Sequence, residues 1–370
     1  LTPLIYSWNF NVQYEFMPKW VLEVGYVGSH GIHQAENLHL LNEPGLASAA
    51  NPINGITTNT TTNASLRVPY LGFGPGGMQY FDTIGDIKFN SLQVTVRKQL
   101  SYGLTFQAAY TWSRAFADFL GPGGANSGDP NNLAQQYGLN TQYRPQRLVI
   151  NYSYNIPTGS MKGVAKAVLG GWSLAGVTTI QDGFPLIIVD SRGGSVYGLS
   201  GSPATILSRA QMAPGATYAD IPSSGPMGAR LGGASLGCGY FACTLNAAGV
   251  PTAFPEFSNI PIIGATPGVP GTGGTGWGNS GIGPVLGPGQ FNFDVTLGKT
   301  TRVGGIHENA QLQFRAEFFN LFNHSQFGNP GPQGVGIAPV ANNVAVGNFG
   351  QITSLSVNPR LMQLALKYVF

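Results

Sequence analysis

Three short motifs in this sequence come closest to phosphate-binding chemistry. Residues 72–77 and 271–276 both match G-x-G-x-x-G, which brings a backbone close to a pyrophosphate when a strand precedes it and a helix follows. Neither stretch has that context, and 54 glycines in 370 residues make chance matches expected. Residues 298–300 read GKT, but Phe293 stands where a P-loop needs its first glycine. We therefore predict no bound cofactor.

Cysteine and histidine are the next candidates for chemistry. Cys238 and Cys243 stand in CGYFAC within a glycine-rich stretch. Their spacing can close a small loop in an oxidising compartment, whereas zinc usually needs four ligands and no second pair lies nearby. We favour a disulfide. His30, His33 and His39 could form a surface metal contact or belong to a polar loop, and we favour the loop.

No catalytic centre can be assembled from the sequence. A G-x-S-x-G motif is absent, and spacing alone gives no Ser–His–Asp arrangement. Five charged residues do stand at polar positions of alternating stretches: Arg147, Asp294, Arg315, Glu317 and Lys367. They could form cross-strand pairs that hold register, or they could line a polar interior against which a plug or solute packs. We favour the pairs, and we predict no catalytic residues, no metal ligands and no enzyme.

The elements that carry these residues are strands with one apolar and one polar face. From Tyr6 to Phe16 every even residue is apolar or aromatic and every odd residue is polar, which is the period of a strand. Each strand is near the 9–11 residues that a tilted membrane strand needs. Eight further stretches repeat the pattern, more weakly at 172–181: residues 20–27, 92–96, 104–112, 147–156, 172–181, 291–297, 311–319 and 362–370.

Connections between these strands are alternately short and long, as in outer-membrane barrels with short periplasmic turns and long extracellular loops. Charged residues make up only 9% of the chain, against roughly 25% in soluble domains. We therefore predict an all-β fold, a transmembrane antiparallel β-barrel in the cell outer membrane, over residues 1–370. Residues 30–87 and 184–288 would be long extracellular loops. A soluble β-sandwich or β-helix is the alternative, and it would have to hide many aromatics.

Two further observations refine the barrel prediction. Aromatic residues of the apolar face fall into two bands, the girdles expected at the two membrane interfaces, so the apolar face of residues 6–16 meets lipid. Nine strands are an odd number, whereas barrels normally close with an even one. Either a strand near residues 185–190 completes the set, or the nine strands belong to a larger barrel. We favour the larger barrel.

Several stretches resemble a known family. Residues 312–330 (LQFRAEFFNLFNHSQFGNP) and 348–370 resemble the C-terminal barrel of TonB-dependent receptors, closest to the Oar-like subgroup common in acidobacteria. Residues 22–33, 90–118 and 170–177 fit the same group. The resemblance covers most strands and is weak in the long loops. It implies a barrel of about 22 strands, of which these would be the last nine.

The resemblance also implies a plug, a TonB box and often a carboxypeptidase-regulatory-like domain, and none of these appears in this chain. The chain starts without Met or a signal peptide, so we take it as a fragment or mature segment. Its C-terminal residues match the insertion signal of outer-membrane proteins, which the barrel-assembly machinery reads: Leu364, Leu366, Tyr368 and Phe370.

The function implied is energised uptake of a bulky solute, such as a siderophore, oligosaccharide or peptide. The expected partners are outer-membrane lipid, the assembly machinery, the extracellular solute, and TonB through a plug domain not present here. A passive porin-like barrel and a surface adhesion or structural protein are the alternatives. A net charge of +3 without a basic tract gives no support for nucleic-acid binding.

Overall fold

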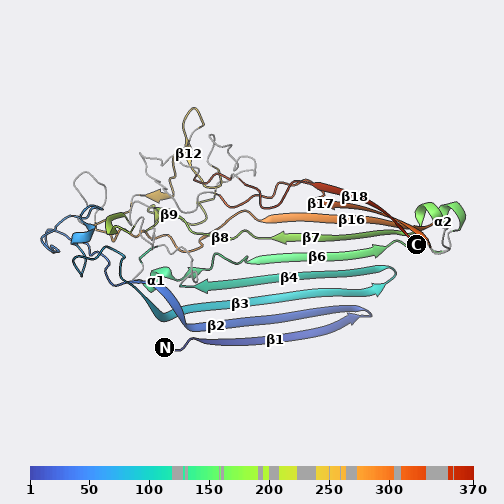
Figure 1. Ribbon diagram of the computed structural model, residues 1–370, viewed down its shortest axis with the longest axis horizontal. Helices are drawn as coiled ribbons and strands as arrows, with labels where there is room; N and C mark the ends of the chain where they lie inside the picture. Colours follow the sequence, from blue (N-terminus) through green and yellow to red (C-terminus); the bar gives the residue numbers. More distant parts are fainter. Residues whose placement is uncertain are drawn as a thin grey trace.

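A wall of nine antiparallel strands runs through the computed structural model (Figure 1). The structure describes residues 1–118, 128–129, 132–157, 159, 162–190, 195–199, 208–222, 239–249, 251–258, 260–263, 273–303, 310–330, 349–352 and 354–370. Each wall strand pairs with the next one along the chain: β1 (Leu4–Met17), β2 (Trp20–Leu40), β3 (Gln79–Ser101), β4 (Leu104–Ala117), β6 (Gln146–Asn155), β7 (Trp172–Gln181), β16 (Gln290–Arg302), β17 (Gln311–Phe319) and β18 (Leu361–Val369). The predicted strands are confirmed.

Register keeps the apolar faces of neighbouring strands together. Val12 stands opposite Val24, which stands opposite Val94, and Val94 stands opposite Tyr110. Because side chains alternate between the two sides of a strand, this register gives the wall one continuous apolar face. Gly28 lies opposite Trp8, and a Cβ at Gly28 would come within 2.3 Å of the Trp8 ring. Glycine therefore makes room for an aromatic ring on this face.

Two ends of the wall differ in how strands are joined. At the turn end (right in Figure 1) lie the C-terminus and α2 (Gly163–Leu169). The β3–β4 connection there is Tyr102–Gly103, both with positive φ, as tight hairpins require. At the loop end (left) lie the long connections. Neither helix of the described residues, α1 (Leu133–Gln136) or α2, is long and apolar enough to cross a membrane.

The loop predicted at residues 30–87 is shorter than expected. β2 continues to Leu40 and β3 begins at Gln79, so the connection covers residues 41–78. Pairing continues through register shifts between Gly31 and Gln34 and between Glu36 and His39. Such bulges break the two-residue period that marks a strand in sequence, so the period alone does not reveal the full length of β2.

The connection predicted at 184–288 runs over 182–289 and contains short elements of its own. They are β8 (Pro185–Leu186), β9 (Val189–Asp190), η2 (Ser195–Tyr197), β10 (Ser208–Arg209), β11 (Gln211–Met212), β12 (Thr244–Leu245), β13 (Pro251–Ala253), β14 (Phe257–Ser258) and β15 (Val285–Leu286). β8 pairs with β15 and β9 with β10, outside the wall. The idea that residues 185–190 supply a missing wall strand is therefore wrong. Elsewhere, η1 (Ala64–Leu66) lies in the 41–78 connection, and β5 (Gly138–Leu139) pairs with β4.

The two outer strands of the wall are open. Within the described residues, β1 pairs only with β2 and β18 only with β17, so the sheet does not close. All fourteen residues of β1 and eight of nine in β18 are exposed. Unpaired N–H and C=O groups cost several kcal/mol each in lipid. These edges are therefore places where further strands have to pair in a membrane.

Candidate functional site

The long connections at the loop end pack into one assembly, which we call the loop body. It consists of the described parts of residues 41–78, 118–145, 182–289 and 320–360, which join β2 to β3, β4 to β6, β7 to β16 and β17 to β18. Figure 1 shows these segments gathered beyond the same end of the wall. A surface built from several connections can bind a ligand only if the connections hold one another in place.

Two buried hydrophobic clusters give the loop body a core. The first joins the 182–289 and 320–360 connections: Leu186, Ile188, Ala210, Ile221, Tyr240, Phe241, Phe254, Phe257, Val285 and Phe349. The second joins the end of β2 to the 182–289 connection: Leu40, Val196, Tyr197, Leu199, Ile262 and Trp277. In the second, Tyr197 stacks on Trp277 with ring centroids 4.5 Å apart. Burial of this kind stabilises a fold in water.

Arg67 ties two connections together from a buried position. Its guanidinium donates to Asn63 Oδ1 (2.9 Å) and to the carbonyls of Thr60 (3.2 Å), Gly45 and Val196. Burial lowers the pKa of this arginine. Val196 belongs to the 182–289 connection, so one side chain fixes the 41–78 connection against its neighbour. The five donors of a guanidinium suit this task, because several carbonyls can be satisfied at once.

A second buried arginine, Arg209, ties another pair of connections together. It donates to the carbonyl of Ser280 (3.1 Å) and to that of Gln135, and burial lowers its pKa to about 10. Gln135 in turn donates through Nε2 to the carbonyl of Gly278 (2.8 Å). The 118–145 connection is thereby fastened to the 182–289 connection by side chains, and also by the backbone N–H of Leu139, which donates to the Ile282 carbonyl.

Aromatic residues bring the last connection into the loop body. Phe349 stacks on Phe241 at 4.7 Å and meets Phe254 edge-on at 4.8 Å. The backbone N–H of Tyr240 donates to the carbonyl of Gly350 (2.6 Å), and its hydroxyl donates to the carbonyl of Leu286 (2.6 Å). All four connections are therefore mutually supported.

The 41–78 connection has an exposed apolar stretch on the surface of this assembly. Tyr70, Leu71 and Phe73 are each more than half exposed. Asn42 holds the base of the stretch: its Oδ1 accepts from the Tyr70 N–H (2.9 Å), and its Nδ2 donates to the Phe73 carbonyl (3.0 Å). We call residues 70–73 the loop tip. Aromatic side chains on a supported loop are suited to contact a solute.

The five charged residues that the sequence places on the polar face do not form one cluster in the structure. Their one mutual ion pair is Arg315–Glu317 (3.1 Å), formed within β17. Register places Gly298 and Ala365 opposite Arg315, so neither of the described residues directly across from it carries a charge. The predicted cross-strand network is therefore wrong for these residues.

The other three of these five charged residues each have uncharged neighbours or partners. Asp294 Oδ1 accepts from Asn292 Nδ2 (3.0 Å) and from the Asn320 N–H (2.8 Å). Arg147 stands opposite Thr111 and Gln181, and Lys367 stands opposite Gln313.

A cross-strand charge pair does exist elsewhere on the polar face. Arg97 Nη2 of β3 lies 3.5 Å from Glu23 Oε2 of β2, and Asn11 of β1 donates to Glu23 Oε1 (2.7 Å). Sequence reasoning missed this set, although the alternation puts Glu23 and Arg97 at polar positions of neighbouring strands. Arg97 is half exposed, so the pair contributes little stability.

The predicted cysteines, histidines and C-terminal residues remain to be placed in the structure. Cys243 is disulfide-bonded, while Cys238 lies outside the described residues. His30 Nε2 lies 2.7 Å from Asp86 Oδ2, and the described residues hold no cluster suited to a metal. The C-terminal residues Leu364, Leu366, Tyr368 and Phe370 are exposed, the first three on β18.

An antiparallel wall with one continuous apolar face and long connections at one end defines an outer-membrane β-barrel protein. Residues 1–363 match the outer membrane beta barrel domain, and the chain belongs to this family. The predicted fold class and outer-membrane location are confirmed.

A solved structure is also similar, that of the outer membrane transporter YddB from Escherichia coli, with a TM-score of 0.40 and 9% sequence identity. The match covers 90% of this chain and 31% of that one, so the chain spans about a third of that transporter's length. No match was found among curated proteins.

Proposed function

We propose that this chain supplies part of the wall and the ligand-capturing surface of an outer-membrane receptor for a bulky solute. The observation that supports the proposal is the loop body, in which two buried cores and two buried arginines together link four connections. Loops that move independently of one another would suffice around the mouth of a passive pore. A packed assembly with an exposed aromatic tip is better suited to present one fixed surface to a large ligand.

Energy coupling through TonB is the second part of the proposal. It rests on the resemblance of residues 312–330 and 348–370 to TonB-dependent receptors of the Oar-like type. The open edges of β1 and β18 support it, because a larger barrel would supply the strands that pair there. A plug would fill such a barrel and contact TonB. The siderophore, oligosaccharide and peptide classes all remain candidate solutes.

The test uses the native gene in its host. We expect deletion to abolish uptake of one labelled solute class, and an uncoupler of the proton-motive force to block that uptake in the wild type. Replacing Tyr70 and Phe73 by Ser should raise the solute concentration for half-maximal uptake. Tyr102→Ser, which changes an exposed aromatic at the turn end, away from the loop body, is the control.

Two other outcomes would contradict the proposal. Uptake that is insensitive to the uncoupler and depends only on solute size would identify a passive pore. Unchanged uptake together with lost surface adhesion would identify a structural or adhesion protein.

A further inference from the structure

Helix α2 at the turn end is held by two side chains of the wall. The indole Nε1 of Trp172 donates to the Val168 carbonyl (3.0 Å). Lys299 Nζ donates to the same carbonyl and to that of Gly170 (3.3 Å). The last turn of a helix leaves its carbonyls without intrahelical partners, and here the wall supplies donors for them. The position of α2 is therefore fixed relative to the wall.

These two side chains tell which side of the wall α2 lies on. Trp172 and Lys299 are opposite each other in register, and the Lys299 ammonium lies 4.7 Å from the Trp172 ring centroid. The same register places Leu174 opposite Leu297 two residues further along. Trp172 and Lys299 thus belong to the apolar face of the wall, which is the lipid-facing side of an outer-membrane barrel. α2 is fastened to that side.

α2 exposes an apolar face that the described residues leave uncovered. Val164, Val168 and Leu169 are 80%, 57% and 53% exposed. Val164 and Val168 are four residues apart and share one face of the helix, whereas Lys166 lies two residues from each and points the other way. An exposed apolar face with a basic opposite face is the pattern of a helix that lies in a membrane interface.

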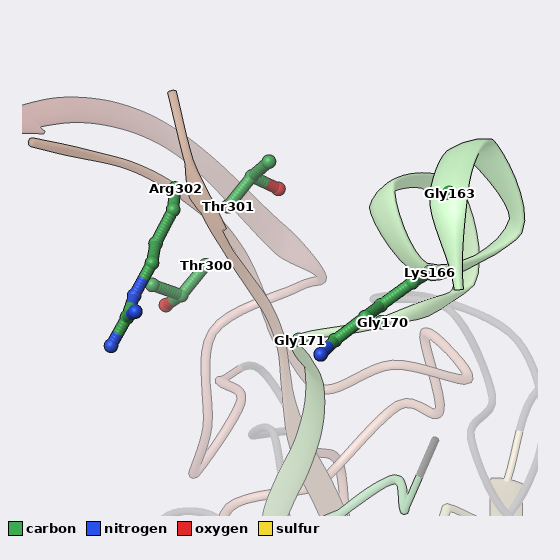
Figure 2. A pocket seen from close by; sticks show the side chains of 7 residues that line it. All are labelled: Gly163, Lys166, Gly170, Gly171, Thr300, Thr301 and Arg302. Carbon is green, nitrogen blue, oxygen red and sulfur yellow. The ribbon is translucent and has the colours of Figure 1, made fainter. Parts of the chain in front are cut away.

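A cavity of about 320 Å³ separates α2 from the end of β16 (Figure 2). It is lined by Gly163, Lys166, Gly170, Gly171, Thr300, Thr301 and Arg302. Figure 2 shows Lys166 reaching from α2 toward Gly171, and Thr301 on the opposite side of β16 from Thr300 and Arg302. By alternation Thr301 shares the lipid face with Lys299, whereas Arg302 belongs to the polar face. Lys166 belongs to α2, which Trp172 and Lys299 fasten to the lipid side.

We propose that α2 is a membrane-interface anchor that binds a phospholipid headgroup. Val164, Val168 and Leu169 insert into the leaflet at the turn end, and the Lys166 ammonium and Thr301 hydroxyl donate to the lipid phosphate. A cation at a membrane surface attracts anionic lipid, and hydrogen bonds to a charged phosphate are stronger than those between neutral groups. We choose a lipid over a soluble anion because the cation stands on the same short helix as the exposed apolar side chains, and that helix is fastened to the lipid-facing side of the wall.

The apolar insertion can be measured in the full-length protein reconstituted in phosphatidylglycerol–phosphatidylcholine vesicles. Among the described residues no free cysteine competes for label, since Cys243 is disulfide-bonded. A fluorophore on Val164→Cys should emit at shorter wavelength than the same label on Leu71→Cys at the exposed loop tip. Lipids carrying a spin label near the headgroup should quench it. Emission equal to that at position 71, without quenching, would overturn the anchor.

The headgroup site has its own matched pair of variants. Lys166→Ala should lower the amount of phosphatidylglycerol retained by the detergent-solubilised protein about fivefold. Arg302→Ala removes an equal charge from the polar side of the same cavity and should leave retention unchanged. Both variants should keep the heat-modifiable gel mobility of a folded barrel.

Inorganic phosphate separates a lipid from a soluble ligand. We expect it not to displace the retained lipid. Competition by phosphate, or equal losses in the two variants, would assign the cavity to a soluble anion and overturn the lipid proposal. Unchanged retention in Lys166→Ala would overturn the phosphate contact. These readouts do not depend on transport, so they stand or fall independently of the proposed receptor function.

Discussion

The wall and the loop body use apolar residues in opposite ways. In the wall, Phe10 and Leu364 are more than two-thirds exposed. In the loop body, Phe241, Phe349 and Trp277 are buried. The same residue types thus cover the outside of one region and fill the inside of the other.

The difference follows from the solvent that each region meets. Lipid accepts apolar side chains, so the wall needs only that every backbone N–H and C=O be paired. The loop body has to exclude water from its own interior, and it does so with packed aromatics and with two buried arginines that satisfy loop carbonyls. Cohesion rests on main-chain hydrogen bonds in the wall and on side chains in the loop body. Equal truncations should therefore have unequal effects in the two regions.

The largest effect is expected at Trp277. Replacing it by Ala removes the ring that stacks on Tyr197 and leaves a cavity, at a cost of about 3–5 kcal/mol. Hydrogen exchange of residues 195–199 should rise by orders of magnitude while the wall stays protected. Loss of protection in the wall as well would show that the two regions unfold together and do not differ in what holds them.

Arg67 should come next. Arg67→Met keeps the apolar stem but leaves the carbonyls of Gly45 and Val196 without donors, at a cost on the order of 3 kcal/mol. Proteases should then cut within residues 41–78 of the intact outer-membrane protein. Arg67→Lys keeps the charge but loses the multiple donors, so intermediate protection is expected. Full protection in Arg67→Met would mean that packing alone holds this connection.

A wall truncation should have a smaller effect. Phe10→Ala removes a lipid-facing ring with no core behind it, so we expect only the loss of the ring's transfer from water to lipid, about 2 kcal/mol, with no added cost for a cavity. The urea-dependent transition of the protein in lipid vesicles would measure it. A loss as large as that of Trp277→Ala would show that the wall depends on side-chain packing.

The smallest effect concerns a carboxyl group in the loop body. Burial raises the pKa of Glu256 above its ordinary value. A raised pKa in the folded state means that the folded protein binds the proton more tightly than the unfolded chain. The stabilisation is complete below the unfolded pKa and is lost as pH rises through the folded one. Glu256→Gln should flatten this dependence of loop-body protease resistance, and an unchanged profile would contradict it.

Sequence alone determined the wall, because alternation of apolar and polar residues is a local pattern that each strand carries by itself. Prediction of the strands from sequence failed where this alternation was interrupted. The bulges between Gly31 and His39 concealed the outer half of β2. The polar-face charges were correctly placed at polar positions of strands, but their partners depended on register, which set Gly298 and Ala365 opposite Arg315.

Only the tertiary structure decided the loop body and the anchor helix. Arg67 reaches Val196 across 129 residues, and Lys299 reaches Val168 across 131. Neither contact has a local signature, since a lone Arg or Lys reads as a surface residue in sequence. Hydrogen bonding to a carbonyl depends on where the wall brings two distant connections together. The sequence therefore fixes which face of each strand meets lipid, and the assembled wall fixes what gathers at its two ends.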